Sequence, residues 1–434
     1  METFEIELES FLKTILPIPE LYEFLLIAQN LSKKRSEFLY FAGGVVRDYL
    51  LKTLYKKKIE KPKDLDLVLQ GNLKNFLEEL LKKVKGEILF ESQFLTYKVK
   101  IYLNGKEFLI DFITARKEIY EDIAKLPKVF PSDFKDDILR RDFTINTLII
   151  GLSPPYKGIL IDLINGKKDL ERGLIKPLYL NSFVDDPTRI FRGIRYKVRF
   201  SFKFAEEFFL ALEKCFKKEA LKKLSATRIA NELRLYLNKE PEEKLKELLE
   251  TTFYLNIFEE AGIKVKKENF NSLIELLSEL RDELNIKERE KFFLLGLLNS
   301  QFLEQALRLG FTEFELKEIK KNIDFINKKY LKDWKKLSLW EKIKVFEKIP
   351  PFYLLALAIY FPEIKEEVIK YFKEYKKIKP ELTGNDLKNL GIKKGKEIGE
   401  LLDLLKRKRI EGEIKTKEEE KDLIIQFLLK KSEN

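Results

Sequence analysis

The chain has 434 residues, of which 44% are hydrophobic and 36% are charged, and it carries a formal net charge of +12 at pH 7. A chain of this length is too long for one hydrophobic core, so about two to four domains are expected. Histidine is absent and Cys215 is the single cysteine, which excludes a disulfide framework, a cysteine-built zinc site and nucleophilic mechanisms that require a histidine base.

Charge and hydropathy indicate the partners and the compartment. The excess of basic residues favours a polyanionic partner such as RNA or DNA, because the release of counterions from phosphates drives association. A thermophilic source rich in Lys and Glu explains part of the same composition. No apolar run reaches the roughly 18 residues of a membrane span, and the acidic sequence METFEIELES is not a signal peptide. We therefore expect a cytoplasmic protein without a membrane partner, in which carboxylates and metal ions carry the chemistry.

Local patterns predict strands mixed with helices up to about Pro177 and an almost entirely helical chain after it. In chain order, the first part is expected to contain helices within 4–33 interrupted around Pro17 and Pro19, a strand at 38–42, a helix at 45–55, a strand ending at Leu69, a helix at 72–84, strands at 94–103 and 107–113, a loop over 117–137, a helix over 138–150, and a strand and turn from Asp162. The helical part is expected to contain a helix at 221–237 capped by Ser225, and a capping box at Thr383 and Asp386.

The first motif is a glycine pair, Gly43 and Gly44, between the strand at 38–42 and the helix that follows. Glycine lets backbone N–H groups approach a phosphate closely, and the N-terminus of a helix adds a positive dipole. The unit therefore predicts a phosphate-binding turn, although a glycine pair after a strand is also common in ordinary turns.

Asp64 and Asp66 lie two residues apart in the next predicted strand, so both carboxylates face the same side. Two like charges that close repel each other unless a cation lies between them, and hard oxygen ligands suit Mg²⁺. The hairpin predicted from Asn104-Gly105 returns a strand that contains Asp111, which offers a third carboxylate to the same site. An exposed strand position is the alternative explanation for each acid.

Arg140, Arg141 and Asp142 form a dense charge cluster in ILRRDFTINTLII. Adjacent arginines can bind phosphate or ribose, while the apolar residues around them face a core. A solvated face stabilised by salt bridges would explain the same cluster.

Asp185 and Asp186 precede Arg189 by four and three residues, so the acids and the base share one helix face. Cytosine and adenine both present an amino donor beside a ring-nitrogen acceptor. A carboxylate can accept from the amino group while a guanidinium donates to the ring nitrogen. Uracil and guanine present the reverse order, at a cost of roughly 1 to 3 kcal/mol for each buried group left unpaired. The pair would thus accept CTP and ATP and reject UTP and GTP, although an acid before a proline also suits a helix N-terminus.

Two stretches near the C-terminus are candidate contacts for nucleic acid. The segment from Gly391 to Gly395 resembles a hairpin between helices whose backbone could hold a phosphate, and the basic tract 406–409 could do the same. A solvated basic face explains the tract equally well.

Seven segments in order resemble the motifs of the class II tRNA nucleotidyltransferases: AGGVVRD, DLDLVLQG, FLIDFITAR, ILRRDFTINTL, DLINGKKDL, DDPTRIFRGIRYKVRF and TRIANEL. This family, part of the polymerase-beta superfamily, contains CCA-adding, A-adding and CC-adding enzymes and the bacterial poly(A) polymerases. The resemblance spans residues 38–237, and LTGNDLKNLGIKKGKEIGELL is similar to the tail of some members.

The resemblance implies an α+β fold with a small mixed sheet in an N-terminal head, followed by all-α regions. The implied domains are a catalytic head at 1–175, a helical neck at 176–240, a helical body at 241–335 and a helical, tRNA-binding tail at 336–434. The implied reaction is template-independent addition of AMP or CMP, from ATP or CTP, to the 3′ end of tRNA, with two Mg²⁺ ions and with the acceptor arm of tRNA as partner.

Residue roles follow from the same resemblance, position by position. Asp64 and Asp66 would be the catalytic metal ligands, joined by Asp111; Gly43, Gly44 and Arg47 would contact the triphosphate; Arg140, Arg141, Asp142 and Asn146 would contact the nucleotide; Asp185, Asp186 and Arg189 would recognise the base; and Arg192, Arg195, Arg228 and Glu232 would support the helix that carries them.

Two departures from the family pattern stand out. Nineteen residues separate Gly44 from Asp64, more than the family leads us to expect, so 53–63 is predicted to form a basic excursion or a longer helix. The base-recognition motif is DDxxR, where many members have EDxxR, so the first acid here is shorter.

Which nucleotide is added stays open. The segments TARKEIYEDIAKLP and DDPTRI favour the A-adding branch, and the long segment at 117–137 argues against a CC-only enzyme. Full CCA addition, poly(A) synthesis and a non-catalytic RNA-binding protein on the same scaffold are the alternatives. A nucleotidyltransferase for small molecules fits poorly, because it leaves the basic helical half without a role.

Overall fold

The structure is a computed structural model that describes residues 1–16, 19–56, 65–298, 300–329, 333–392 and 395–432. It divides into two compact units. The N-terminal unit comprises Met1–Glu232 and Tyr254–Ala261, and the C-terminal unit comprises Leu233–Phe253 and Gly262–Asn434.

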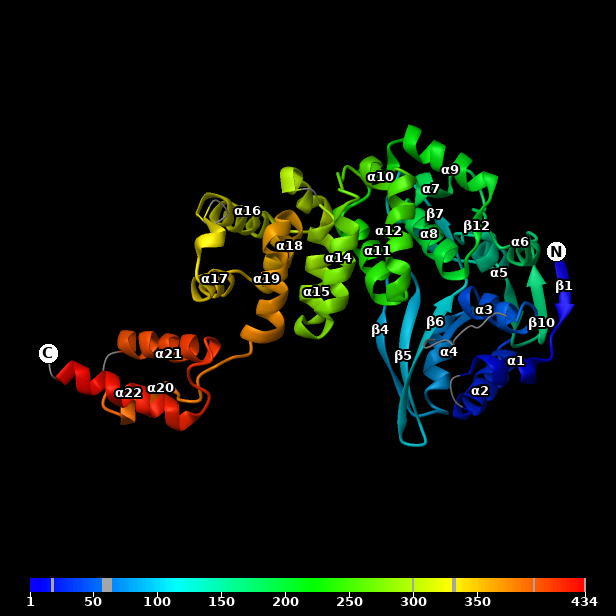
Figure 1. Ribbon diagram of the computed structural model, residues 1–434. Coiled ribbons are helices and arrows are strands. Elements are labelled where there is room, and N and C mark those ends of the chain that lie inside the picture. The colour runs from blue at the N-terminus through cyan, green and yellow to red at the C-terminus, as the bar shows by residue number, and fades with distance from the viewer. Residues whose placement is uncertain (17–18, 57–64, 299, 330–332, 393–394, 433–434) are drawn as a thin grey trace. The chain divides into compact units, whose positions relative to one another are not determined.

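The N-terminal unit is built on an eight-stranded mixed sheet with the strand order β1-β10-β9-β2-β3-β6-β5-β4 (Figure 1). Its strands are β1 (Glu2–Glu5), β2 (Phe38–Ala42), β3 (Leu65–Gln70), β4 (Gly86–Glu91), β5 (Thr96–Leu103), β6 (Lys106–Thr114), β9 (Ile149–Gly151) and β10 (Ile159–Asp162). The β3–β6 pair is parallel and the other pairs in this sheet are antiparallel. The predicted α+β fold with a mixed sheet is confirmed.

Helices flank this sheet. They are α1 (Leu8–Ile15), α2 (Glu20–Lys34), α3 (Gly44–Thr53), α4 (Leu73–Leu80) and α5 (Phe134–Leu139). Both α2 and α3 contact β2, and α4 contacts β6. Every residue of β2 is buried, as expected for a strand covered on both faces. The end of β2 that leads into α3 is therefore surrounded by packed side chains.

The β5–β6 hairpin confirms the prediction made from Asn104-Gly105. Both turn residues have positive φ, 50° at Asn104 and 77° at Gly105. Two positive φ angles in a two-residue turn give the twist that antiparallel strands need, which Asn-Gly adopts at little cost. This turn sets the register that carries Asp111 along β6.

Two predictions in the N-terminal unit are wrong. The expected loop at 117–137 is a two-stranded hairpin of β7 (Arg116–Ile119) and β8 (Lys128–Pro131), followed by α5. The expected helix at 138–150 is instead the end of α5, the short 3-10 helix η1 (Thr144–Asn146) and the start of β9. The backbone N–H of Thr144 donates to the carbonyl of Lys176 at 3.0 Å, so a partner distant in sequence replaces the helical hydrogen bond.

The N-terminal unit continues with helices and two short paired strands. They are α6 (Gly166–Arg172), β11 (Leu174–Ile175), α7 (Ser182–Asp185), α8 (Thr188–Phe200), β12 (Lys203–Phe204), α9 (Glu206–Lys217), α10 (Ala220–Lys223), α11 (Ala226–Lys239), which runs into the C-terminal unit, and α13 (Ile257–Glu260). The helix predicted at 221–237 is thus divided between α10 and α11. The Ser225 hydroxyl accepts from the Arg228 N–H at 3.4 Å, at the start of α11.

The described part of the C-terminal unit is helical. Besides the rest of α11, it contains η2 (Glu242–Lys244), α12 (Leu245–Tyr254), α14 (Asn269–Glu279), η3 (Arg281–Glu283), α15 (Ile286–Gly296), η4 (Ser300–Leu309), α16 (Glu313–Lys329), η5 (Trp334–Lys336), α17 (Leu339–Phe346), α18 (Pro351–Tyr360), η6 (Pro362–Ile364), α19 (Lys365–Lys370), the π-helical η7 (Tyr371–Tyr375), α20 (Gly384–Asn389), α21 (Gly395–Ile410) and α22 (Lys417–Ser432). None of the helices in the described ranges has the length and apolar character needed to cross a bilayer.

One of the two C-terminal predictions can be compared with this unit. The capping box at Thr383 and Asp386 is present at the start of α20 and is confirmed. In the segment from Gly391 to Gly395, residues 393–394 lie outside the described residues.

The basic tract 406–409 lies on α21 and is paired with glutamates of its own unit. Lys406 pairs with Glu347, Arg407 with Glu411, Lys408 with Glu411 and Glu413, and Arg409 with Glu381 and Glu420. The tract is therefore engaged in intramolecular ion pairs.

Candidate active site

A cavity of about 420 Å³ lies in the N-terminal unit, beside the glycine turn after β2 and the start of β3. Twelve of the residues predicted to form a site line it: Gly43, Gly44, Arg47, Asp66, Arg140, Arg141, Asp142, Asn146, Asp186, Arg189, Arg192 and Arg195. Asp111, Asp185, Arg228 and Glu232 are not part of its lining, and Asp64 lies outside the described residues.

The glycine turn has a conformation that explains its first residue. Gly43 has φ +71° and ψ −128°, a backbone region that side chains avoid. A Cβ at this position would lie 2.8 Å from Nη1 of Arg141. The helix α3 begins at Gly44, so a helix N-terminus and an unshielded backbone meet at the cavity wall.

Sheet register aligns two carboxylates next to this turn. Asp66, the second residue of β3, is the partner of Asp111 in the parallel β3–β6 pair, so the two side chains stand on the same face of the sheet. On the other side of β6, Asp111 is the partner of Lys98, whose Nζ lies 2.6 Å from Oδ1 of Asp111. Among the described residues, no group of three or more metal-ligating side chains is assembled.

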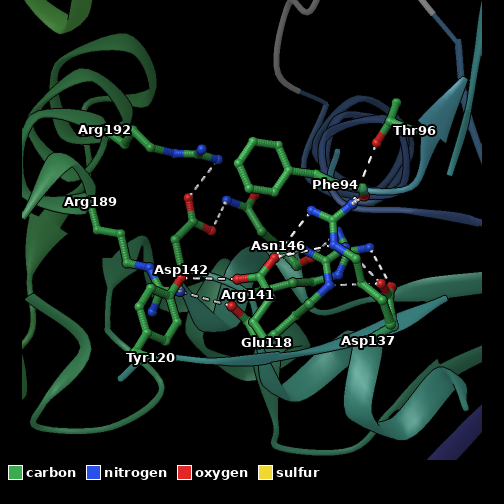
Figure 2. A network of polar contacts seen from close by, with 12 residues as sticks. Phe94, Thr96, Glu118, Tyr120, Asp137, Arg141, Asp142, Asn146, Arg189 and Arg192 are labelled. Atoms are coloured by element: carbon green, nitrogen blue, oxygen red, sulfur yellow. Dashed lines mark hydrogen bonds and ion pairs between the residues drawn. The ribbon is translucent and has the colours of Figure 1, made fainter. Parts of the chain in front are cut away.

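A network of buried charges forms the wall below the cavity (Figure 2). Asp137 is fully buried and accepts from Nη2 of Arg140 at 2.7 Å and from Nη2 of Arg141 at 2.8 Å. Glu118, on β7, accepts from Nη1 of Arg140 at 3.0 Å and from Nη2 of Arg116 at 3.1 Å. The network connects the β7–β8 hairpin to Arg140 and Arg141.

Burial by itself would raise the pKa of Asp137, but Arg141 and Arg140 outweigh burial and lower the pKa to about 2. A carboxyl with a lowered pKa in the folded state stabilises the fold at pH values above its unfolded pKa. That contribution is lost as the pH falls from about 4 to about 2.

We expect the Asp137→Asn variant to lower the free energy of unfolding by about 2 kcal/mol at pH 7, because two buried arginines lose their anionic partner. The difference from the wild type should shrink as the pH falls towards 2. Chemical denaturation at pH 7 and at pH 3 measures both effects. Asp122→Asn is the matched control, since Asp122 is exposed in the loop between β7 and β8 and its ion pair is with exposed Lys125. Equal unfolding free energies for Asp137→Asn and the wild type at pH 7 would contradict this expectation.

A second chain of polar contacts crosses the cavity from α8 to α3. Arg192 pairs with Oδ2 of Asp142 at 2.8 Å, and Oδ1 of Asp142 accepts from Nδ2 of Asn146 at 2.9 Å. The carbonyl oxygen Oδ1 of Asn146 in turn accepts from Nη1 of Arg47 at 2.7 Å. Burial would raise the pKa of Asp142, but Arg192 and the hydrogen bond from Asn146 lower it. Asp142 is therefore held as an anion between the guanidinium of Arg192 and the amide of Asn146.

The residues predicted to recognise the base divide into two groups. Asp186 and Arg189 line the cavity, and Oδ1 of Asp186 accepts from Nη2 of Arg228 at 2.6 Å. Asp185 is outside the lining and interacts with the hydroxyl of Tyr179. Arg189 is only 4% exposed, and Ser182 accepts from its Nη1 at 2.8 Å.

Several residues at the site were missed by the sequence analysis. They are Arg116, Glu118, Tyr120, Asp137, Tyr179, Ser182 and Tyr196. A usable signal exists for the first three, because Arg116, Glu118 and Tyr120 alternate with period two, as residues on one face of a strand do. Asp137 also carried a signal, since its partners Arg140 and Arg141 follow it by three and four residues, the spacing of ion pairs on one helix face.

Known proteins resemble this chain in sequence. The family model described as "Poly A polymerase head domain" matches residues 39–176. The A-adding tRNA nucleotidyltransferase of Halalkalibacterium halodurans is 28% identical over 390 residues, which cover 88% of this chain and 86% of that protein. The A-adding tRNA nucleotidyltransferase of Aquifex aeolicus is 30% identical over 392 residues, which cover 85% of this chain and 44% of that protein. The chain thus spans less than half the length of the second relative.

Solved structures agree with the sequence relatives. The apo form II of a CCA-adding enzyme superposes with a TM-score of 0.76 at 25% identity, covering 98% of this chain and 100% of that one. The family predicted from the order of the motifs is therefore confirmed. The chain is similar to A-adding and CCA-adding tRNA nucleotidyltransferases over most of its length, and residues 39–176 match the head domain of poly(A) polymerases.

Proposed function

We propose that this chain adds AMP or CMP, without a template, to the 3′ end of tRNA, and that A addition is its main activity. The observation that carries the proposal is that one cavity is lined by the glycine turn, by Asp66 and by the pair Asp186 and Arg189. A triphosphate site, a carboxylate and a candidate base-recognition pair then lie within reach of one nucleotide. The relatives from H. halodurans and A. aeolicus, both named A-adding, support the choice of nucleotide.

Carboxylate oxygens are the hard ligands that Mg²⁺ prefers. Asp66 and Asp111 stand side by side on one face of the sheet, and Lys98 already supplies a cation to Asp111. We propose that Asp66 and Asp111, together with Asp64, hold the ions. When bound, Mg²⁺ neutralises charge at the reacting phosphate and favours deprotonation of the attacking hydroxyl.

The remaining residues position the reactants. In the proposed reaction, the tRNA 3′-oxygen forms a bond to the α-phosphorus, the bond from this phosphorus to the bridging oxygen of the β-phosphate breaks, and pyrophosphate leaves. Backbone N–H groups at Gly43 and Gly44 and the guanidinium of Arg47 would bind the triphosphate. Arg141 and the arginines of α8 that line the cavity would offset the charge that pyrophosphate carries away.

Base recognition is proposed for Asp186 and Arg189. In the described residues, the hydrogen bonds recorded for Asp186 all use Oδ1, from Thr188 and Arg228. The other oxygen, Oδ2, would accept from the exocyclic amino group of adenine or cytosine. The terminal nitrogens of Arg189 donate to Tyr179, Ser182, Tyr120 and the carbonyl of Arg140, so its Nε would donate to the ring nitrogen beside that amino group. A carbonyl at the amino position would face the carboxylate and leave both unpaired.

Primer extension distinguishes the possible activities. Transcripts of one tRNA that end before CCA, after C and after CC are offered to the full chain with ATP, with CTP or with both, and the products are sized. We expect the transcript ending in CC to gain one residue with ATP and the others to remain unextended with CTP alone. Extension of all three to CCA would show full CCA addition instead, a long A tail would show poly(A) synthesis, and no extension of any transcript would overturn the proposal.

A further inference from the structure

Arg189 lies between two tyrosines, and each terminal nitrogen of its guanidinium donates to one of them. Its Nη2 donates to the hydroxyl oxygen of Tyr120 at 3.2 Å, and its Nη1 donates to that of Tyr179 at 3.3 Å. Its Cζ is 5.8 Å from the ring centroid of Tyr120 and 5.9 Å from that of Tyr179. The plane of the guanidinium is thus fixed from two sides.

Tyr120 is itself oriented by Glu118. The Tyr120 hydroxyl donates to Oε2 of Glu118 at 3.0 Å. A phenol has one proton, so a hydroxyl that donates to Glu118 must present a lone pair to Arg189. Figure 2 shows Tyr120 beside Arg189, with Glu118 among the same network of contacts.

Glu118 is held in turn by the charges below the cavity. Its Oε1 accepts from Arg140 at 3.0 Å and from Arg116 at 3.1 Å, and its side chain is 8% exposed. The backbone carbonyl of Arg140 also accepts from Nη2 of Arg189, at 2.9 Å. One end of the guanidinium of Arg189 is therefore fixed by the β7–β8 hairpin and by the RRD segment together.

At the other end of the guanidinium, Nη1 donates to Ser182 at 2.8 Å and to Tyr179 at 3.3 Å. Tyr179 interacts with the carboxylate of Asp185, the first acid of the DDxxR motif, and Asp185 is half-buried. Tyr179 is 36% exposed, whereas Tyr120 is held by a buried acid with two arginine partners. Of the two tyrosines, Tyr120 is therefore the more firmly held.

We propose that Tyr120 is a positioning residue for base selection: with Glu118, it fixes the angle at which Arg189 meets the nucleobase. This inference rests on the proposed function, since it assigns Tyr120 to the selectivity of that reaction. A hydrogen bond to the wrong base edge becomes possible only if the guanidinium can rotate or shift, because uracil and guanine place a donor where adenine and cytosine place an acceptor. Removing the Tyr120 hydroxyl takes away one of the two acceptors of Nη2 and leaves the Arg140 carbonyl alone at that end, which gives the guanidinium more freedom.

The test is the Tyr120→Phe variant of the full chain, which keeps the ring and removes the hydroxyl. We measure kcat/KM for ATP, CTP, UTP and GTP on the transcript that the wild type extends best. The preference for the wild type's own nucleotide over UTP and GTP should fall roughly tenfold, as expected for loss of one hydrogen bond to a charged group. The KM for the transcript should stay within about twofold, since Tyr120 is not proposed to contact RNA.

Tyr102→Phe is the matched control, because Tyr102 also donates to a glutamate, Oε1 of Glu87 at 3.1 Å, on an exposed part of the sheet. It should leave the nucleotide preference unchanged. Glu118→Gln provides a second variant that weakens the same support, and it should also lower the preference. An unchanged preference in both Tyr120→Phe and Glu118→Gln would overturn the inference.

A double-mutant cycle separates positioning from a general structural effect. In an Arg189→Lys background, Tyr120→Phe should change the preference by less than about twofold, because the group that Tyr120 orients is gone. Equal effects of Tyr120→Phe in both backgrounds would also overturn the inference. A wild type that extends no transcript would instead refute the proposed function, so the two failures are distinct.

Discussion

Replacing Asp66 with asparagine should lower kcat for nucleotide incorporation about a thousandfold, which corresponds to about 4 kcal/mol of lost transition-state stabilisation. The variant keeps the size of the side chain and removes the negative charge that Asp66 places opposite Asp111. The cost should fall on the transition state, where the cation that the carboxylates are proposed to hold would be needed most. Single-turnover incorporation with saturating transcript measures this rate directly.

Transcript affinity should be almost unchanged in Asp66→Asn, because Asp66 is proposed to hold a metal ion and not the RNA. Glu107→Gln is the control: Glu107 is an exposed carboxylate on the same sheet, and its closest described partner is Lys100 at 3.5 Å. It should incorporate nucleotide at the wild-type rate. Near-normal turnover by Asp66→Asn would rule out the role proposed for the carboxylates.

Arg189→Ala should reduce discrimination between the preferred nucleotide and UTP or GTP by roughly 10- to 100-fold. The guanidinium is the group proposed to match a ring-nitrogen acceptor, and without it the carboxylate of Asp186 distinguishes bases alone. The affinity for the transcript should change much less. The ratio of kcat/KM values for the four nucleotides is the measurement.

A buried arginine also supports the fold, so a control for lost stability is needed. Arg35→Ala serves, because Arg35 is a partly buried arginine that pairs with Glu37 at 2.8 Å, on the N-terminal unit and outside the cavity lining. It should lower the thermal midpoint without changing the preference among nucleotides. If Arg189→Ala rejects UTP and GTP as strongly as the wild type, base recognition must lie with other residues.

Features set by local sequence were predictable. The Asn104-Gly105 hairpin and the capping box at Thr383 depend on residues that are adjacent or three apart, and both are present. The family was also predictable, because the order of several short motifs is a property of the sequence itself.

Features set by distant partners were not. The apolar spacing of 138–150 is compatible with a helix, but the Thr144 N–H binds the carbonyl of Lys176, and Ile149 pairs with Ile161 in the sheet. The strand β1 was missed for the same reason, since its partner β10 lies over 150 residues later. Pairing at such distances leaves no periodic trace in one sequence.

The site shows the same division. The residue types that line the cavity could be named from motifs, but their connections could not. Glu118 reaches Arg140 across 22 positions and Tyr120 reaches Arg189 across 69. Asp64 lies outside the described residues. So does most of the segment 53–63, whose extra length stood out in the sequence. The helix α3 ends at Thr53, so the described residues show no longer helix there.

The ion pairs of the basic tract 406–409 affect the rate at which an RNA would associate with this protein. Four cations on α21 are matched by five glutamates of the same unit. Beyond the Debye length of about 8 Å at physiological salt, such a group has almost no net field. It therefore cannot accelerate the diffusional capture of a polyanion, although it can exchange a glutamate for a phosphate once contact is made. The positive charge that steers an RNA towards the protein must come from lysines and arginines elsewhere on the chain.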